Sequence, residues 1–150
     1  MSLNDSHYNF YGRRDILDLL TKRVLGLKDG YRQNLALLGS RYVGKTSLVE
    51  RFIYNFEDKE VIVVYLNLES HDFSHFVLQM CKGVLYHFLK SKGQPLQEDL
   101  QLLLEANRES IAQTCQAIES IQQMLKEAKN NEAYTQLLNL PEIFNQETKK

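Results

Sequence analysis

The clearest chemical possibilities in the sequence lie in one short run of glycines, a lysine and a threonine. The run Gly39-Ser40-Arg41-Tyr42-Val43-Gly44-Lys45-Thr46 matches the pattern G-x-x-x-x-G-K-[ST]. Glycines at its two ends allow the backbone N–H groups to turn inward and enclose a phosphate. The lysine can reach β- and γ-phosphate oxygens, and the hydroxyl of Thr46 can ligate Mg²⁺. The run therefore predicts a nucleotide-phosphate site with Thr46 as the metal ligand.

The segments around this run are those that would position it. A short apolar run at 34–38 predicts a buried strand, and apolar spacing predicts a helix over 45–56. The β-branched run 61–68 predicts a second strand. A strand, a helix and a strand in this order indicate a parallel sheet covered on both faces. The fold class predicted here is α/β, an incomplete three-layer core with parallel strands, followed by an α-helical segment.

Two stretches resemble a known family. The run 38–48 is similar to the G-x-R-x-x-G-K-T-S-L form of the P-loop (Walker A) in AAA+-related ATPases, above all the archaeal-type and STAND ATPases. The run 10–20 resembles the F-x-G-R-x-x-E-L box, which lies beside adenine and ribose in those families. The resemblance covers about residues 10–90 and implies ATP and Mg²⁺ as cofactors. The nucleotide-binding residues it implies are Gly39, Ser40, Arg41, Tyr42, Val43, Gly44, Lys45, Thr46, Ser47, Tyr11, Gly12 and Arg13.

The acidic residues that such ATPases need for hydrolysis are missing. The resembling families carry them at the end of a later strand, and no apolar strand follows 61–68 in this sequence. Glu69 is the one acid in a position to replace them. The resemblance therefore implies the N-terminal part of a larger ATPase that binds Mg-ATP without hydrolysing it efficiently. No catalytic residue is assigned, and a GTPase is disfavoured because no N-K-x-D run occurs.

Residues 94–150 form a second region, helical in character, after a nucleotide-binding region at 1–93. Apolar residues recur every seven positions, at 104, 111, 118 and 125, which predicts one long amphipathic helix over 96–129 or two shorter ones. This region suggests an alternative function. The chain would then be a helical protein-interaction module, through a protein partner or self-association, with a regulatory or structural nucleotide site.

Composition excludes several other classes. A net charge of −1 over 150 residues gives no general attraction to nucleic acid or anionic lipid. No apolar run is long enough for a membrane span, and Cys81 and Cys115 are in no metal or redox spacing, so we expect a cytoplasmic protein. His71 and His75 have a spacing compatible with metal on a helix, but no third ligand accompanies them, and no metal site is predicted there.

Overall fold

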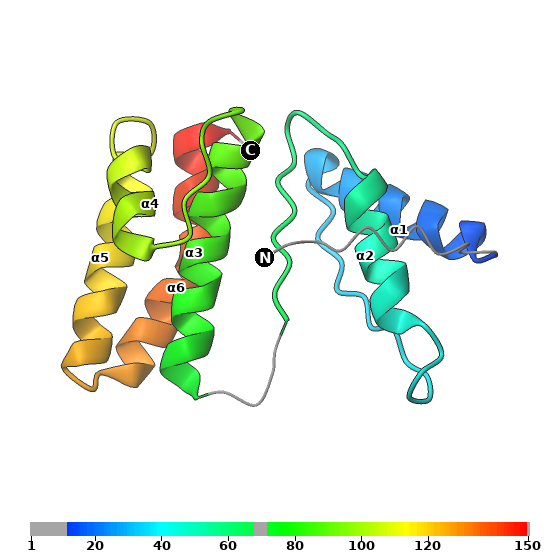
Figure 1. Cartoon of the computed structure of the whole chain (residues 1–150), viewed down its shortest axis with the longest axis horizontal. Coiled ribbons are helices and arrows are strands. Elements are labelled where there is room, and N and C mark those ends of the chain that lie inside the picture. The colour runs from blue at the N-terminus through cyan, green and yellow to red at the C-terminus, as the bar shows by residue number, and fades with distance from the viewer. Residues whose placement is uncertain (1–11, 68–71, 150) are drawn as a thin grey trace. The chain divides into compact units, whose positions relative to one another are not determined.

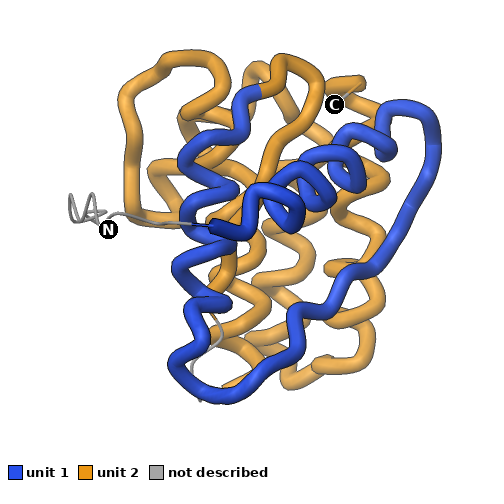
Figure 2. The backbone as a smooth tube through the Cα atoms, turned by 90° about the vertical axis from the view of Figure 1, so that its right-hand side faces the viewer, with its two compact units in different colours: residues 1–57 blue, residues 58–150 orange. Residues whose placement is uncertain are grey.

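The computed structural model describes residues 12–67 and 72–149, and helices are the regular elements of this part of the chain (Figure 1). The chain divides into two compact units, unit 1 at Met1–Glu57 and unit 2 at Asp58–Lys150 (Figure 2). Unit 1 contains α1 (Arg14–Leu25), the 3-10 helix η1 (Gly26–Asp29) and α2 (Lys45–Asn55). Unit 2 contains α3 (Phe73–Ser91), α4 (Leu100–Asn107), α5 (Ala112–Lys126) and α6 (Asn130–Thr148).

Unit 1 has a small interior. Among its described residues, only Leu48 and Phe52, both on α2, are buried, at 2% and 8% exposure. Helix α1 packs against α2 but contains no fully buried residue. The rings of Phe52 and Phe56 contact each other with centroids 5.1 Å apart. Two buried side chains provide little of the apolar burial that stabilises a domain.

Unit 2 contains the main hydrophobic core, to which all four of its helices contribute. Helices α5 and α6 form the most extensive pair, joined by a short turn. Such an arrangement is typical of an antiparallel helical bundle. The buried apolar residues are Val77, Cys81, Val84, Leu85, Phe88, Leu89, Leu100, Leu103, Leu104, Ile111, Cys115, Ala117, Ile118, Ile121, Ala133, Leu137, Leu140 and Phe144.

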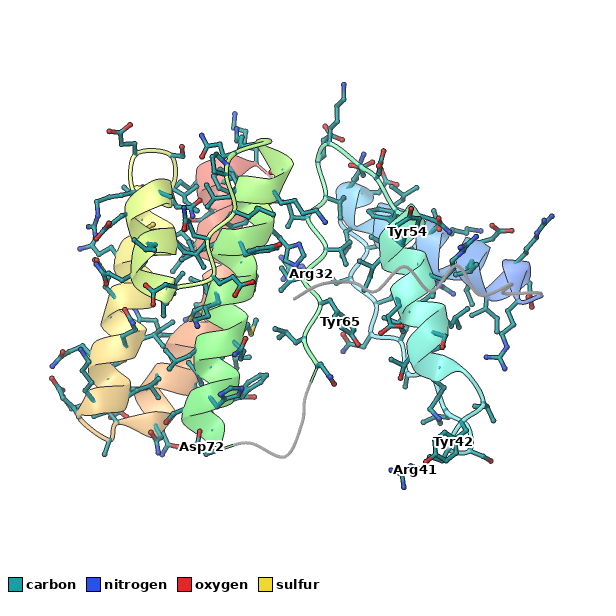
Figure 3. The ribbon with its side chains drawn as sticks, viewed as in Figure 1. Arg32, Arg41, Tyr42, Tyr54, Tyr65 and Asp72 are labelled. Carbon is teal, nitrogen blue, oxygen red and sulfur yellow. The ribbon has the colours of Figure 1, made fainter. Side chains whose placement is uncertain are left out.

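Carboxylates fix the starts of three helices in unit 2. Asp72 accepts a hydrogen bond from the backbone N–H of His75 at 2.7 Å and so caps α3 (Figure 3). Asp99 caps α4 by accepting from two backbone N–H groups of the first turn. The cap of α5 comes from far along the chain, because Glu147 on α6 accepts from the backbone N–H groups of Gln113 and Thr114, both at 2.9 Å. This last contact ties the end of α6 to the start of α5.

Asn107 and Thr114 are polar residues that are completely buried, and Asn107 lies between α3 and α4. The side-chain amide of Asn107 donates to the carbonyl of Leu103 at 2.7 Å and to that of Leu85 at 3.4 Å. Its oxygen Oδ1 has no hydrogen-bond partner among the described residues. The bond to Leu85 links the end of α4 to α3, whereas the bond to Leu103 stays within α4. Asn107 thus helps to hold the end of α4 against α3.

The predicted three-layer α/β core with parallel strands is wrong. Residues 34–38 and 61–67 have no regular secondary structure, and within the described ranges neither pairs as a strand. Residues 61–67 follow an extended, nearly straight path beside α3 (Figure 1). Leu35 and Leu38 are 47% and 92% exposed, which contradicts a buried strand. A β-branched or apolar run favours an extended backbone, but a sheet also requires a hydrogen-bonded neighbour, which a local pattern cannot specify.

The helical predictions are partly right. Apolar residues at helical spacing over 73–88, followed by Gly93-Gln94-Pro95, predict a helix that ends before 93. This prediction is confirmed, because α3 ends at Ser91 and buries Val77, Val84 and Phe88. Of the two alternatives for 96–129, the pair of shorter helices is confirmed and the unbroken helix is wrong, since a turn at 108–110 separates α4 from α5. Three of the heptad residues, Leu104, Ile111 and Ile118, are nevertheless fully buried. The seven-residue spacing therefore predicted which residues are buried but did not predict the turn at 108–110.

Candidate functional site

The loop at 39–46 forms a tight turn that leads into α2. Gly44, the residue before α2, has a φ of 82°, a conformation that glycine adopts without strain. The ammonium of Lys45 donates to the carbonyls of Gly39 and Ser40, each at 2.7 Å. The N–H groups of the first turn of α2, which includes Thr46, have no intrahelical acceptor, as in any helix, and Gly44 has no side chain to cap them. Lys45 thus closes the loop on itself.

The run 10–20, expected beside the nucleotide, contacts this loop through Arg13. The guanidinium of Arg13 donates to the carbonyl of Val43 at 2.6 Å. Gly12 and Arg13 both have positive φ values, 92° and 59°, just before α1 begins. Tyr11 lies outside the described residues. Arg13 therefore contacts the loop backbone, whereas the nucleotide-binding role expected for Gly12 and Arg13 stays a prediction.

The other residues expected at the loop are on its outside. Tyr42 is 91% exposed and its φ is 66°. The guanidinium of Arg41 lies 5.5 Å from the centre of the Tyr42 ring, and both side chains extend from the tip of the loop (Figure 3). Ser40, Thr46 and Ser47 are also exposed.

The resemblance to AAA+ and STAND ATPases is not supported. A P-loop functions at the end of a strand in a parallel sheet, and the described part of the chain contains only helices as regular elements. The ATPase-fragment function, with its P-loop, Walker A and AAA+ assignments, is therefore corrected along with the fold. Glu69 and His71 lie outside the described residues, and no cluster of three or more His, Cys, Asp or Glu side chains occurs within those residues.

A second candidate site lies on unit 2, over the first half of α6. A shallow depression of about 510 Å³ is lined by polar residues of α6. A neighbouring depression of about 370 Å³ is lined by Phe73, Asn130, Asn131 and Tyr134. The rings of Phe73 and Tyr134 lie with centroids 6.1 Å apart, so α3 and α6 together form its apolar part. We define the α6 surface by Phe73, Asn130, Asn131, Glu132, Tyr134, Thr135, Gln136, Leu138 and Asn139.

Two large side chains make the α6 surface partly apolar. Tyr134 and Leu138 are 46% and 59% exposed. They are four residues apart on one helix and therefore lie on the same side of it. Their neighbours Leu137 and Leu140 are buried, at 1% and 0% exposure. Helix α6 thus anchors itself in the core by one face and presents Tyr134 and Leu138 outward by another.

The charge of α6 is one-sided. From Asn130 to Thr148 the sequence has three glutamates and no lysine, arginine or histidine. Glu147 caps α5, whereas Glu132 and Glu142 are exposed. The remaining polar residues of this helix are mainly amides. The α6 surface therefore combines exposed apolar groups, amide hydrogen-bonding groups and negative charge.

Sequence reasoning missed the α6 surface. It treated residues 94–150 as one helical region and named no residue in it as a binding site. The absence of basic residues between 130 and 148 was readable from the sequence. Which of the leucines point outward was not, since Leu137 and Leu138 are adjacent and only the packing of α6 distinguishes them.

The two cysteines are not reactive groups. Cys81 and Cys115 are free and buried. Burial raises the pKa of the Cys81 thiol to about 12, and burial also raises that of Cys115 to about 11. Because the thiolate is the nucleophilic form, both remain inert at neutral pH. They belong to the core.

The comparisons with known proteins give no match, either with a protein-family model, with a curated protein or with a solved structure. Within residues 12–67 and 72–149, no helix has the length and apolar character required to span a bilayer.

Proposed function

We propose that unit 2 is a helical protein-interaction module and that the α6 surface is its binding site. The observation that carries this proposal is the outward exposure of Tyr134 and Leu138 on a helix whose other face is anchored in the core. Exposed aromatic and aliphatic side chains beside polar groups are typical of interaction sites. A rigid helix also holds them in place without an ordering cost on binding.

The charge of α6 indicates the chemistry of the partner. Glu132 and Glu142 are exposed with no basic residue on the same helix. A complementary partner carries lysine or arginine next to apolar side chains, as an amphipathic helix with one basic edge does. The apolar residues would contact Tyr134 and Leu138, and the basic edge would face the glutamates.

Two exposed leucines of unit 2 allow a matched test. Leu138 lies on the α6 surface at 59% exposure, and Leu102 lies on α4 at 47%. The full chain, Leu138→Asp and Leu102→Asp are immobilised and exposed to the same cell extract, and retained proteins are quantified by mass spectrometry. The affinity of each retained protein is then measured by titration.

The proposal predicts that Leu138→Asp weakens a specific partner at least about tenfold, while Leu102→Asp changes its affinity by less than about threefold. Glu132→Lys should also weaken binding, and more so at low salt, because the contact is electrostatic. Equal retention by the full chain and Leu138→Asp would contradict the proposal.

A regulatory ligand at the loop 39–46 is the second part of the proposed function. The loop offers Lys45 and the uncapped start of α2 to the phosphates of ATP, and Thr46 to Mg²⁺. Equilibrium dialysis with Mg-ATP, comparing the full chain with Lys45→Ala, tests this part alone. Equal binding by the two would refute it and leave the α6 proposal intact.

Two free cysteines fit a reducing compartment, and we propose the cytoplasm.

A further inference from the structure

We call residues 61–66 the extended segment. Its backbone groups have no hydrogen-bond partners within the described part of the chain. The six residues Val61-Ile62-Val63-Val64-Tyr65-Leu66 are all apolar in character and partly buried. Backbone N–H and C=O groups of folded chains are normally paired with protein groups or with water. The segment therefore has backbone groups that a partner strand could pair.

One face of the extended segment is fixed on α3. Ile62 and Val64 pack against the core of unit 2. A Cβ atom at Gly83 of α3 would lie 2.6 Å from Val64 Cγ1, so only glycine allows the segment to lie this close. Successive side chains of an extended chain alternate, so Val61, Val63 and Tyr65 lie on the opposite face. Figure 3 shows Tyr65 directed away from α3.

The N–H and C=O groups of an extended chain point to its two edges, whereas its side chains point to its two faces. A second extended strand alongside can form hydrogen bonds with all the groups of one edge. We propose that the extended segment pairs in antiparallel fashion with the same segment of a second copy of this chain. The pairing is self-complementary about a two-fold axis, which is the commonest symmetry of homodimers. It is independent of the α6 surface.

Charge excludes a parallel pairing, and the register that we propose is antiparallel with Val64 on the axis. A parallel, in-register pair would place Lys59 opposite Lys59 and Glu60 opposite Glu60, which is unfavourable. The antiparallel pair with Val64 on the axis separates these charges and sets Ile62 opposite Leu66 and Val63 opposite Tyr65. Residues that face each other then lie on the same side of the ribbon, as antiparallel pairing requires. The α3-facing residues of both copies thus share one face.

The size of the contact limits its strength. Six extended residues span about 20 Å, and a ribbon of this length buries less than the roughly 800 Å² per partner of a standard interface. The dimer should therefore be weak and depend on concentration. Sedimentation equilibrium of the full 150-residue chain over a wide concentration range should show a reversible monomer–dimer equilibrium.

Paired substitutions on the outward face test the register without disturbing the α3 contact. Val63→Glu with Tyr65→Glu places like charges opposite each other twice, and we expect the dissociation constant to rise at least about tenfold. The matched control, Val63→Thr with Tyr65→Thr, keeps neutral strand-forming side chains and should change it by less than about threefold. Circular dichroism checks that each variant retains its helices.

Charge reversal separates a broken contact from a misfolded chain. Mixing the double glutamate variant with Val63→Lys, Tyr65→Lys should restore the dimer as a heterodimer, because opposite charges then face each other. A full chain that stays monomeric at every concentration would overturn the proposal, including the case in which the segment pairs within its own chain. So would undiminished association of the glutamate variant, or a mixture that remains monomeric.

Discussion

The loop region of unit 1 and the helical bundle of unit 2 differ in two respects. One has a specific sequence motif and few buried residues, and the other has no recognised motif and a large apolar core. The loop 39–46 has the most specific motif of the chain, yet its unit buries only Leu48 and Phe52 among the described residues. Unit 2 has no recognised motif but buries eighteen apolar residues in one core. A short motif therefore reports the local chemistry of a loop, whereas the three-dimensional framework depends on apolar patterns spread over many residues.

Truncating leucines should destabilise the two units by very different amounts. Leu104→Ala in unit 2 removes a side chain with 0% exposure and should destabilise the chain by about 2–5 kcal/mol. Leu35→Ala in unit 1 removes one that is 47% exposed and should cost less than about 1 kcal/mol. Chemical denaturation of both variants measures the difference. Equal large losses would mean that residues 34–38 belong to a core after all.

Gly83→Ala tests whether the extended segment is held closely on α3. The new Cβ would lie 2.6 Å from Val64 Cγ1, and overpacking of this kind costs about 1–3 kcal/mol, partly offset by the better helix propensity of alanine. Thermal unfolding should show the loss, and adding Val64→Ala should recover part of it by making room. A simple stabilisation by Gly83→Ala would show that the segment does not pack at this distance.

Glu147→Ala tests whether Glu147 stabilises unit 2 by capping α5 rather than through its charge at the surface. The variant removes the acceptor of two backbone N–H groups and of the Thr114 hydroxyl, and should destabilise unit 2 by about 1–2 kcal/mol. Gln146→Ala, at an exposed neighbour on α6, should stay within about 0.5 kcal/mol. Similar values for the two variants in urea denaturation would refute the long-range cap.

Lys45→Ala should have a smaller effect, because its two carbonyl contacts lie at an exposed loop. We expect a loss of about 0.5–1.5 kcal/mol in the free energy of unfolding, the usual net contribution of such hydrogen bonds. The helical circular dichroism should not change. Loss of the helical signal at room temperature would contradict the minor structural role assigned to this loop.

High pH should weaken unit 2 gradually through its buried thiols. The pKa of Cys81 is raised from 9.0 to about 12 and that of Cys115 from 9.0 to about 11, in both cases by burial. Above pH 9 the unfolded chain releases these protons and the folded chain does not, so stability falls as the pH rises toward 11–12. Cys81→Ala combined with Cys115→Ala should flatten this part of the pH profile, and an unchanged slope would assign it to other groups.

How far the sequence predicted the structure depended on the range of the interaction. Helix α3, with its stripe of Val77, Val84 and Phe88, and the loop before α2 follow from spacings within a few residues and were predicted. The sheet was not, because an extended run such as 61–66 specifies no partner. The cap of α5 by Glu147 joins residues more than thirty positions apart and has no local pattern. The α6 surface was missed for a similar reason, since its exposure depends on how α6 packs.

Native-state hydrogen exchange of the full chain, at a concentration low enough to keep it monomeric, distinguishes a helical core from a paired sheet. We expect amides of α3, α5 and α6 to exchange only through global unfolding, because these helices enclose the core. Amides of 35–38 and 61–66 should exchange orders of magnitude faster, because within the described residues they have no hydrogen-bonded partner. If 35–38 and 61–66 were instead as protected as α5, these segments would be paired in a sheet and the helical description would be wrong.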